Sequence, residues 1–329
     1  MRPLIQHRKR LLQAIQIITF LAIAVWLLLS VDWNEAVGLL ASADWRWLAA
    51  AAAALTLQTI LSALRWRMTA GRLGITLSVP QAVQEYYLSL IVNQSLPGGV
   101  LGDAGRAVRA RGQAGLMAAG QSVLFERLAG QIGLVAVLVG GLCAALVYPV
   151  DGSSARALVS GILWGFGIAL IVATCAAIVF LWHKDSSSRV RRLLFPLYTC
   201  IFASEVRRPQ MMLSLGTAIC NVAAFGFCAA ALGVHFGLIT LAVLVPLILF
   251  AMLLPLSISG WGPREGVAAA LFPIFGATAG QGLATSITFG LVFLVSVLPG
   301  LVLAWLRPNA SVAGEHDDTK TGEPKCQSA

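Results

Sequence analysis

Charged side chains are scarce in this 329-residue chain, in which they make up 11% of the residues. A soluble globular domain carries roughly 25% charged residues, because its exterior faces water. Apolar residues reach 58%, and the few charges stand in short groups between long apolar runs. This pattern excludes an ordinary soluble domain and is typical of a protein that is surrounded by a lipid bilayer.

Side chains that commonly bind metals or form disulfides are few and scattered. The chain has six cysteines and four histidines, and no CxxC pair or Cys/His pair at ligand spacing occurs. Most of the cysteines lie inside apolar runs, where a cysteine behaves as a small hydrophobic residue. The sequence therefore predicts no metal site, no disulfide framework and no cofactor.

Sequence signatures of the common enzyme classes are missing as well. GxSxG, HExxH and Walker A patterns do not occur, so ATP hydrolysis in this chain would not drive any transport. We therefore expect a protein that is not an enzyme. The net charge of +9 does not indicate nucleic acid, because the basic residues flank apolar segments and no nucleic-acid-binding motif accompanies them.

Six apolar runs are long enough to cross a bilayer. We expect helices, because a lipid-exposed backbone must satisfy its own hydrogen bonds. The first run follows a basic cytoplasmic N-terminus, residues 1–10, and no small-residue cleavage site follows it, so a retained helix is expected. The polar residues 308–329 predict a disordered cytoplasmic tail. The six predicted spans are 11–31, 47–64, 128–148, 157–181, 211–232 and 281–306.

Two further apolar regions, 81–103 and 240–275, are interrupted in their middles. We expect both to be re-entrant or broken helical hairpins. With the N-terminus in the cytoplasm, all but three of the 23 Lys and Arg residues then face the cytoplasm, as the positive-inside rule requires. The residues expected at the breaks are Pro97, Gly98, Gly99 and Gly102 in the first region, and Pro255, Gly260 and Gly262 in the second.

The resulting topology has internal order within a single transmembrane domain, residues 11–307. Each half, 11–148 and 157–306, contains two spans, a hairpin and a further span, and the halves have opposite orientation. Both hairpins also carry the pattern L-P-x4-G-x3-R, which ends at Arg106 and at Arg264. The sequence thus predicts an all-α membrane protein of about six full spans and two hairpins, arranged as the inverted repeat that is typical of transporters.

Ionisable residues at membrane depth are the candidate site. Such residues are costly in lipid and are functional candidates by default. Arg264 and Glu265 follow the second break, Asp103 and Arg106 follow the first, and the amides of these Gly-rich turns suit an anion such as a lipid phosphate. The candidate headgroup-binding residues are Asp103, Arg106, Glu126, Arg127, Arg264 and Glu265.

Structural readings compete with binding at several of these positions. Arg264 and Glu265 can neutralise each other, and Glu126-Arg127 can be a buried ion pair that fixes helix register. The stretch Arg65-Trp66-Arg67 ends the second span and is interpreted as an interfacial anchor. An interfacial helix is expected near 193–203. The remaining polar residues are interpreted as topology determinants (Arg109 and Arg111) or as the lining of a polar cavity (Glu85, Asn93 and Gln94).

Four segments carry a resemblance to a known family. They are ALRWR (63–67), SLPGGVLGDAGRAVRAR (95–111), SVLFERLAG (122–130) and LPLSISGWGPREG (254–266). In this order they resemble the lysylphosphatidylglycerol synthase transmembrane-region family of flippase-like membrane proteins. Trp261 departs from the pattern, because a smaller residue is expected there. The resemblance carries over to Pro97, Gly98, Gly102, Asp103, Arg106, Glu126, Arg127, Gly260, Arg264 and Glu265.

The resemblance implies a stand-alone lipid translocator of the bacterial plasma membrane, since the soluble aminoacyl transferase half of the two-part relatives is missing. Arg106 and Arg264 would hold the phosphate of an anionic lipid headgroup, oriented by the nearby carboxylates. The alternatives are an enzyme or accessory subunit in lipid-linked sugar, aminoacyl-lipid or hopanoid metabolism, and a non-catalytic membrane scaffold. A membrane partner or a homo-oligomer is also compatible with the sequence.

Overall fold

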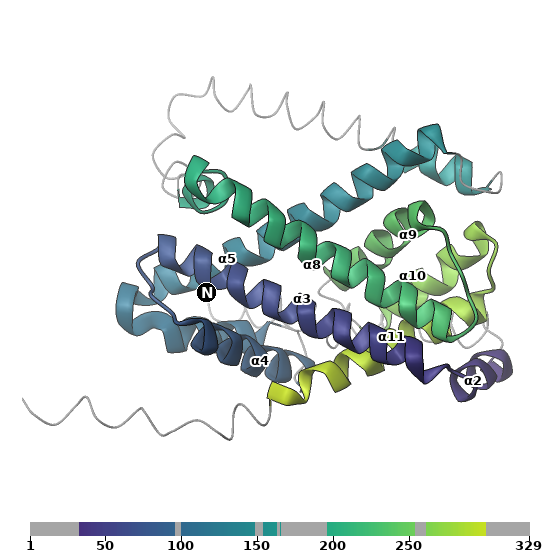
Figure 1. Ribbon diagram of the computed structural model, residues 1–329, viewed down its shortest axis with the longest axis horizontal. Helices are drawn as coiled ribbons and strands as arrows, with labels where there is room; N and C mark the ends of the chain where they lie inside the picture. The colour runs from purple at the N-terminus through teal and green to yellow at the C-terminus, as the bar shows by residue number, and fades with distance from the viewer. Residues whose placement is uncertain are drawn as a thin grey trace, which may run out of the picture.

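The computed structural model describes residues 33–95, 100–148, 154–162, 165, 196–253 and 261–300, and every regular element in them is a helix (Figure 1). The predicted first span, most of the predicted span 157–181 and the predicted tail lie outside these residues. The helices are α2 (Trp33–Ala41), α3 (Trp45–Arg72), α4 (Val79–Ser95), α5 (Leu101–Val147), α8 (Ser204–Ala231), α9 (Leu238–Phe250), η2 (Ala251–Leu253), α10 (Pro263–Leu271), η3 (Phe272–Phe275) and α11 (Ala279–Val297).

Four of these helices, α3, α5, α8 and α11, are long and apolar enough to cross a membrane. At 1.5 Å per residue the 28 residues of α3 span about 42 Å, more than the hydrocarbon core of a bilayer. Large apolar side chains are exposed at helical spacing, for example Leu124 and Leu128 on α5 and Leu215 and Ile219 on α8. An apolar exterior of this kind fits lipid, so the prediction of a helical membrane protein is confirmed.

Helices α3 and α8 form an antiparallel pair along their full lengths. The Asp44 amide, just before α3, donates to the carbonyl of Ala231 at the end of α8 (2.9 Å). At the opposite end, Arg72 of α3 pairs with Glu205 in the first turn of α8. Both helices have 28 residues, and they form the most extensive helix pair in the described structure (Figure 1).

The two members of this pair end in the same way. After α3, Gly74 has a φ of 82°, and the Ile75 amide donates back to a helix carbonyl at 3.0 Å. After α8, Gly233 has a φ of 76°, and the Val234 amide donates back at 2.9 Å. Only glycine adopts such a φ without strain, which is why the cap needs it. Helices α4 and α9 both begin five residues after this glycine.

Helix α4 and the first part of α5 form a helical hairpin. The Asn93 side chain near the end of α4 accepts from the Gly102 amide at 2.8 Å, and Glu85 pairs with Arg109 further from the break at 2.5 Å. The contact closer to the break joins the later residue of α4 to the earlier residue of α5, and the contact further away joins the earlier residue of α4 to the later residue of α5. The two arms are therefore antiparallel. Gly102 lies in the first turn of α5 and not in the break, and its lack of a side chain lets the arms approach closely.

The helix that follows this hairpin is longer than predicted. The predicted span 128–148 is the second part of α5, which begins at Leu101 and has one non-helical residue, Gly115 (φ 83°, ψ 164°). The hairpin arm therefore runs from 101 to 114, beyond the expected boundary at 103. A prediction from apolar content places the start of the span after Glu126-Arg127. Because these two charged residues are paired with other residues of the protein, they do not interrupt the helix.

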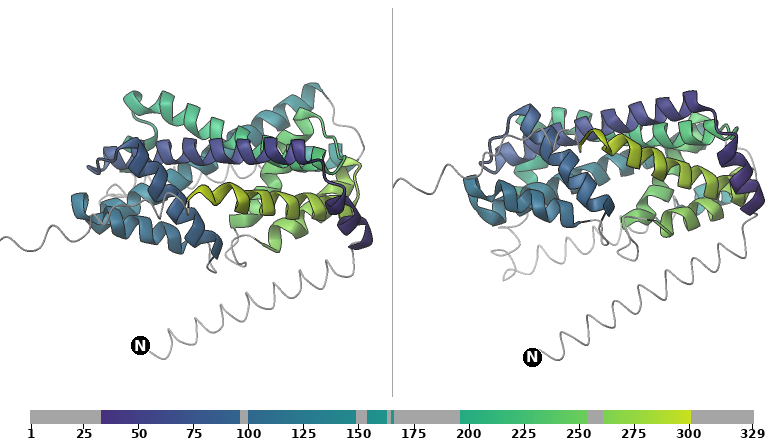
Figure 2. Two further views of the ribbon diagram at one scale, coloured as in Figure 1. Left: turned by 60° about the horizontal axis from the view of Figure 1, so that its bottom comes forward. Right: turned by 90° about the horizontal axis from the view of Figure 1, so that it is seen from below.

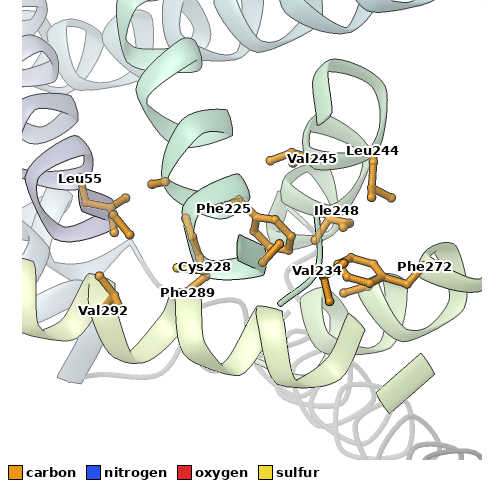
Figure 3. Packing of buried hydrophobic residues seen from close by; sticks show 14 residues of the cluster. Leu55, Phe225, Cys228, Val234, Leu244, Val245, Ile248, Phe272, Phe289 and Val292 are labelled. Atoms are coloured by element: carbon orange, nitrogen blue, oxygen red, sulfur yellow. The ribbon is translucent and has the colours of Figure 1, made fainter. Parts of the chain in front are cut away.

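The second interrupted region also forms a hairpin, from α9 and α10, and its break at 254–260 lies outside the described residues. Gly262 has a φ of 96° and precedes Pro263, the first residue of α10. The two hairpins lie at opposite ends of the long axis, and α11 contacts both of them, whereas α3 packs on the first hairpin (Figure 2). The second hairpin packs through a cluster in which Phe225 of α8 contacts Phe272 and Phe289 (Figure 3).

The region near 193–203 is helical at residues 196–201. Cys200 and Ile201 are buried there against Phe125 and Ala129 of α5. The predicted interfacial helix thus packs one face on the protein. The short helix α2 was not expected from the sequence.

Candidate functional site

Five charged residues, four of them buried and one exposed, form a cluster that we call the Arg106 cluster. It comprises Arg65 of α3 with Asp103, Arg106, Glu126 and Arg127 of α5. Glu126 is 0%, Arg106 1%, Arg65 3% and Asp103 8% exposed. Charges buried this deeply persist only when they are paired, so their pairing pattern defines the site.

The ion pairs of the Arg106 cluster form a chain of alternating charge. Glu126 bridges two guanidinium groups, with Oε1 at 2.6 Å from Nη2 of Arg65 and Oε2 at 3.4 Å from Nη2 of Arg106. Asp103 Oδ1 lies 3.1 Å from Nη2 of Arg106, and Asp103 also pairs with Arg127. Glu126 and Arg127 are sequence neighbours, but the cluster gives them different partners.

Two aromatic rings enclose the Arg106 guanidinium. Its Cζ lies 4.4 Å from the ring centroid of Trp66 and 4.5 Å from that of Tyr86. The indole N–H of Trp66 donates to Ser122 at 3.1 Å, and the Tyr86 hydroxyl donates to Glu126 at 3.3 Å. Because these contacts desolvate Arg106, its electrostatic interactions are stronger than they would be in water.

The interpretation of Arg65-Trp66-Arg67 as an interfacial anchor was wrong for its first two residues. Arg65 and Trp66 are buried in the Arg106 cluster, whereas Arg67 is exposed and donates to the carbonyl of Leu77 at 2.7 Å. Residues i and i+2 point about 200° apart on a helix of 3.6 residues per turn. The side chain of Arg65 therefore points into the protein, and that of Arg67 points out of it. The amino-acid composition of the segment does not show this difference.

The Arg106 cluster has more positive than negative charge. Among the described residues it contains three arginines and two carboxylates, an excess of one positive charge when all are ionised. The Nε and Nη1 atoms of both Arg65 and Arg106 are buried and have no hydrogen-bond partner within the described parts of the chain. Buried donors without partners are costly, and arginine N–H groups in this state are suited to an anion.

A second charged group, which we call the Arg264 group, lies at the start of α10. Nε and Nη2 of Arg264 both contact Glu265 Oε1, at 3.1 and 2.5 Å. The same two nitrogens donate to the hydroxyl and the carbonyl of Ser286, at 2.9 and 3.0 Å. The rings of Trp261 and Phe289 lie 5.2 and 5.4 Å from the Arg264 Cζ. Arg264 is thus paired with its own sequence neighbour.

The structure divides the six predicted site residues between two groups. Four belong to the Arg106 cluster, and Arg264 and Glu265 form the other group. Sequence reasoning missed Arg65, Trp66 and Tyr86 as members of the site, because their partners are distant in sequence. Of the residues expected to line a cavity, Glu85 and Asn93 bind the opposite hairpin arm. The break residues Pro97, Gly98, Gly99, Pro255 and Gly260 lie outside the described residues.

The sequence motifs around the Arg106 cluster and the Arg264 group lie within a region that matches a known protein family. Residues 13–300 match the family model described as the lysylphosphatidylglycerol synthase TM region. The chain belongs to this family. The match includes both hairpins and all six predicted site residues, and it supports a multi-pass membrane protein whose function is related to lipid flipping. Comparisons with curated proteins and with solved structures gave no significant match.

Gly130 allows Arg65 to lie against α5. A Cβ at this position would be 2.8 Å from Nη2 of Arg65. We expect Gly130→Ala to displace the guanidinium from Glu126 and to lower the thermal unfolding midpoint in detergent. Gly140→Ala, on the same helix with open space around its Cβ, is the matched control and should be neutral or stabilising. Equal midpoints for both variants would contradict the placement of Arg65.

Proposed function

We propose that this protein moves a lipid with an anionic headgroup across the bacterial plasma membrane. The observation that carries the proposal is the excess positive charge of the Arg106 cluster, together with the unpartnered nitrogens of Arg65 and Arg106. Phospholipids, glycolipid phosphates and polyprenyl-linked lipids all present such an anion. The acyl chains stay in the bilayer, so only the polar headgroup needs a path through the protein.

The proposal includes an inverted repeat with about six full spans and both termini in the cytoplasm. A two-fold axis in the membrane plane requires equivalent helices that pack on each other to be antiparallel. Helices α3 and α8 are antiparallel, as this symmetry requires. They also have equal length and the same glycine cap, as equivalent helices would. Under this proposal, the α4–α5 hairpin and the α9–α10 hairpin are equivalent and enter from opposite sides.

The two hairpins would then flank the path of the headgroup. Arg106 and Arg264 lie just after the breaks of the respective hairpins, and α11 contacts both hairpins (Figure 2). Rocking of one half against the other would expose the Arg106 cluster to each side in turn.

A transport assay with the purified protein in vesicles tests this function. A fluorescent lipid with an anionic headgroup is placed in one leaflet, and its transfer is followed by dithionite quenching. We expect the wild-type protein to accelerate transfer and Arg106→Gln to remove most of this activity, because the central cation of the site is lost. Arg67→Gln, which changes an exposed arginine, is the control. Wild-type protein without activity towards anionic lipids, or a fully active Arg106→Gln variant, would contradict the proposal.

A further inference from the structure

The two hairpins carry an arginine at the same place but surround it differently. Arg106 and Arg264 each lie nine residues after the proline of the break. Three residues before them stand Asp103 and Trp261, and each of these contacts its arginine, as an ion pair and as an aromatic ring respectively. The corresponding positions are therefore acidic in the first half and aromatic in the second.

The helices that follow the hairpins repeat this contrast. Glu126, on the second part of α5, pairs with Arg106, whereas Phe289, on α11, places its ring 5.4 Å from the Arg264 Cζ. Arg106 thus has two acidic neighbours from its own half, whereas the rings of Trp261 and Phe289 lie beside Arg264. The only carboxylate that pairs with Arg264 within the described residues is its neighbour Glu265.

The hydrogen bonds of the two arginines differ in the same sense. Nε of Arg264 is engaged by Glu265 and Ser286, and so is Nη2. Nε and Nη1 of Arg106 have no hydrogen-bond partner among the described residues, although the side chain is 1% exposed. The Arg264 pair is neutral, whereas the Arg106 cluster has one positive charge in excess.

Glu265 also ties the Arg264 pair to the backbone. Its Oε2 accepts from the amide of Gly262 at 2.6 Å. Gly262 has a φ of 96° and directly precedes α10. Gly290 makes room for the pair, because a Cβ there would be 2.5 Å from Nη2 of Arg264. These contacts hold α10 in a defined position on α11.

Resting on the proposed function, we propose that the first half alone binds the anionic group. Arg65 and Arg106 together bind a phosphodiester with one negative charge, and Arg264 is a positioning residue that holds the second hairpin in place. One negative charge neutralises the excess of the Arg106 cluster, whereas a phosphomonoester, at about −1.5 to −2 at pH 7, overcompensates it. The cluster reaches the surface at Arg127, whose side chain is 44% exposed, and the headgroup enters there.

Lipid binding to the purified protein in detergent tests this division, with native mass spectrometry as the readout. The probes are phosphatidylglycerol, a phosphodiester, and phosphatidic acid, a phosphomonoester. We expect tighter binding of phosphatidylglycerol. Arg65→Gln and Arg106→Gln should each weaken it about tenfold or more, because a charge-assisted hydrogen bond is lost. Arg264→Gln and the exposed control Arg67→Gln should change the apparent Kd less than about twofold.

A rate measurement separates positioning from binding. Arg264→Gln should slow lipid transfer in vesicles and lower the unfolding midpoint at unchanged Kd, and Arg264→Lys should restore part of both. If Arg106→Gln or Arg65→Gln does not fold, Arg106→Lys and Arg65→Lys replace them. The lysine variants keep the charge but lose the unpartnered Nε and Nη1 donors, so weaker binding of phosphatidylglycerol is again expected.

Several results would overturn the division between the halves. They are a loss of affinity in Arg264→Gln as large as in Arg106→Gln, unchanged affinity in both Arg65 variants, and a preference for phosphatidic acid. Absence of lipid binding and transfer in the wild-type protein would instead refute the proposed function. Soluble glycerophosphoglycerol, the same headgroup without acyl chains, is the last arm. It should bind more weakly than the lipid, and equal affinity would overturn the assignment to a lipid.

Discussion

Replacing Gly102 with alanine should separate the two arms of the α4–α5 hairpin. A Cβ at this position would lie 2.0 Å from the carbonyl oxygen of Ser89 and 2.9 Å from Oδ1 of Asn93. The closest atom belongs to the backbone, so no side-chain rotation relieves the clash and the helices must move apart. That movement breaks the hydrogen bond from the Gly102 amide to Asn93 and the bond from Ser89 to Asp103. We expect a loss of about 3 kcal/mol or more in the free energy of unfolding.

Thermal unfolding in detergent, followed by tryptophan fluorescence, measures this loss. Gly112→Ala is the matched control, because it lies on the same hairpin arm with no atom within 4 Å of its Cβ. In the control, alanine in an open helix position should be neutral or stabilising by roughly 0.5–1 kcal/mol. Equal unfolding midpoints for Gly102→Ala and Gly112→Ala would show that the arms do not pack as closely as the structure has them.

Replacing Glu126 with glutamine should have the largest effect of any conservative change in the Arg106 cluster. Its carboxylate bridges Arg65 and Arg106 and is completely buried. The amide keeps the size of the side chain but removes the charge, which leaves the cluster with two uncompensated positive charges. Loss of one partner of a buried ion pair costs about 3–5 kcal/mol, so a strong fall in the unfolding midpoint is expected.

A surface pair provides the matched control for this change. Glu205, 75% exposed, pairs with Arg72, and removal of an exposed pair costs about 1 kcal/mol or less. Glu205→Gln should therefore leave the unfolding midpoint almost unchanged. Raising the concentration of an anionic lipid should partly restore the stability of Glu126→Gln, because a bound anion replaces the lost charge. Wild-type stability of Glu126→Gln in lipid-free detergent would contradict the bridging role.

The pattern of apolar runs and breaks predicted much of the fold. Run 47–64 lies inside α3, run 211–232 lies in α8 except for its last residue, and the region 240–275 forms the hairpin of α9 and α10. The prediction was less accurate at the first hairpin, whose second arm continues to Gly115. Hydropathy marks where a segment becomes polar, but it does not show whether that polarity is satisfied inside the protein. The full count of six spans and the inverted repeat stay predictions.

Four of the predicted site residues come together, but their partners could not be read from the chain. Arg65 lies 61 residues before Glu126, and no local pattern distinguishes it from Arg67. Arg264 was expected to hold the same anion as Arg106, and its own hydrogen bonds give it a different environment. The sequence contains both arginines in the same pattern, whereas the side chains that surround them come from other helices.

The sequence by itself determined that this chain is a helical membrane protein with two interrupted helices and charged residues beside the interruptions. These features follow from local chemistry, because lipid requires apolar helices and proline and glycine break them. Only the tertiary structure decided which charges meet. Ion pairs between α3 and α5 depend on how helices pack, and packing places Arg65 beside Glu126 while leaving Nε and Nη1 of both Arg65 and Arg106 without a hydrogen-bond partner among the described residues.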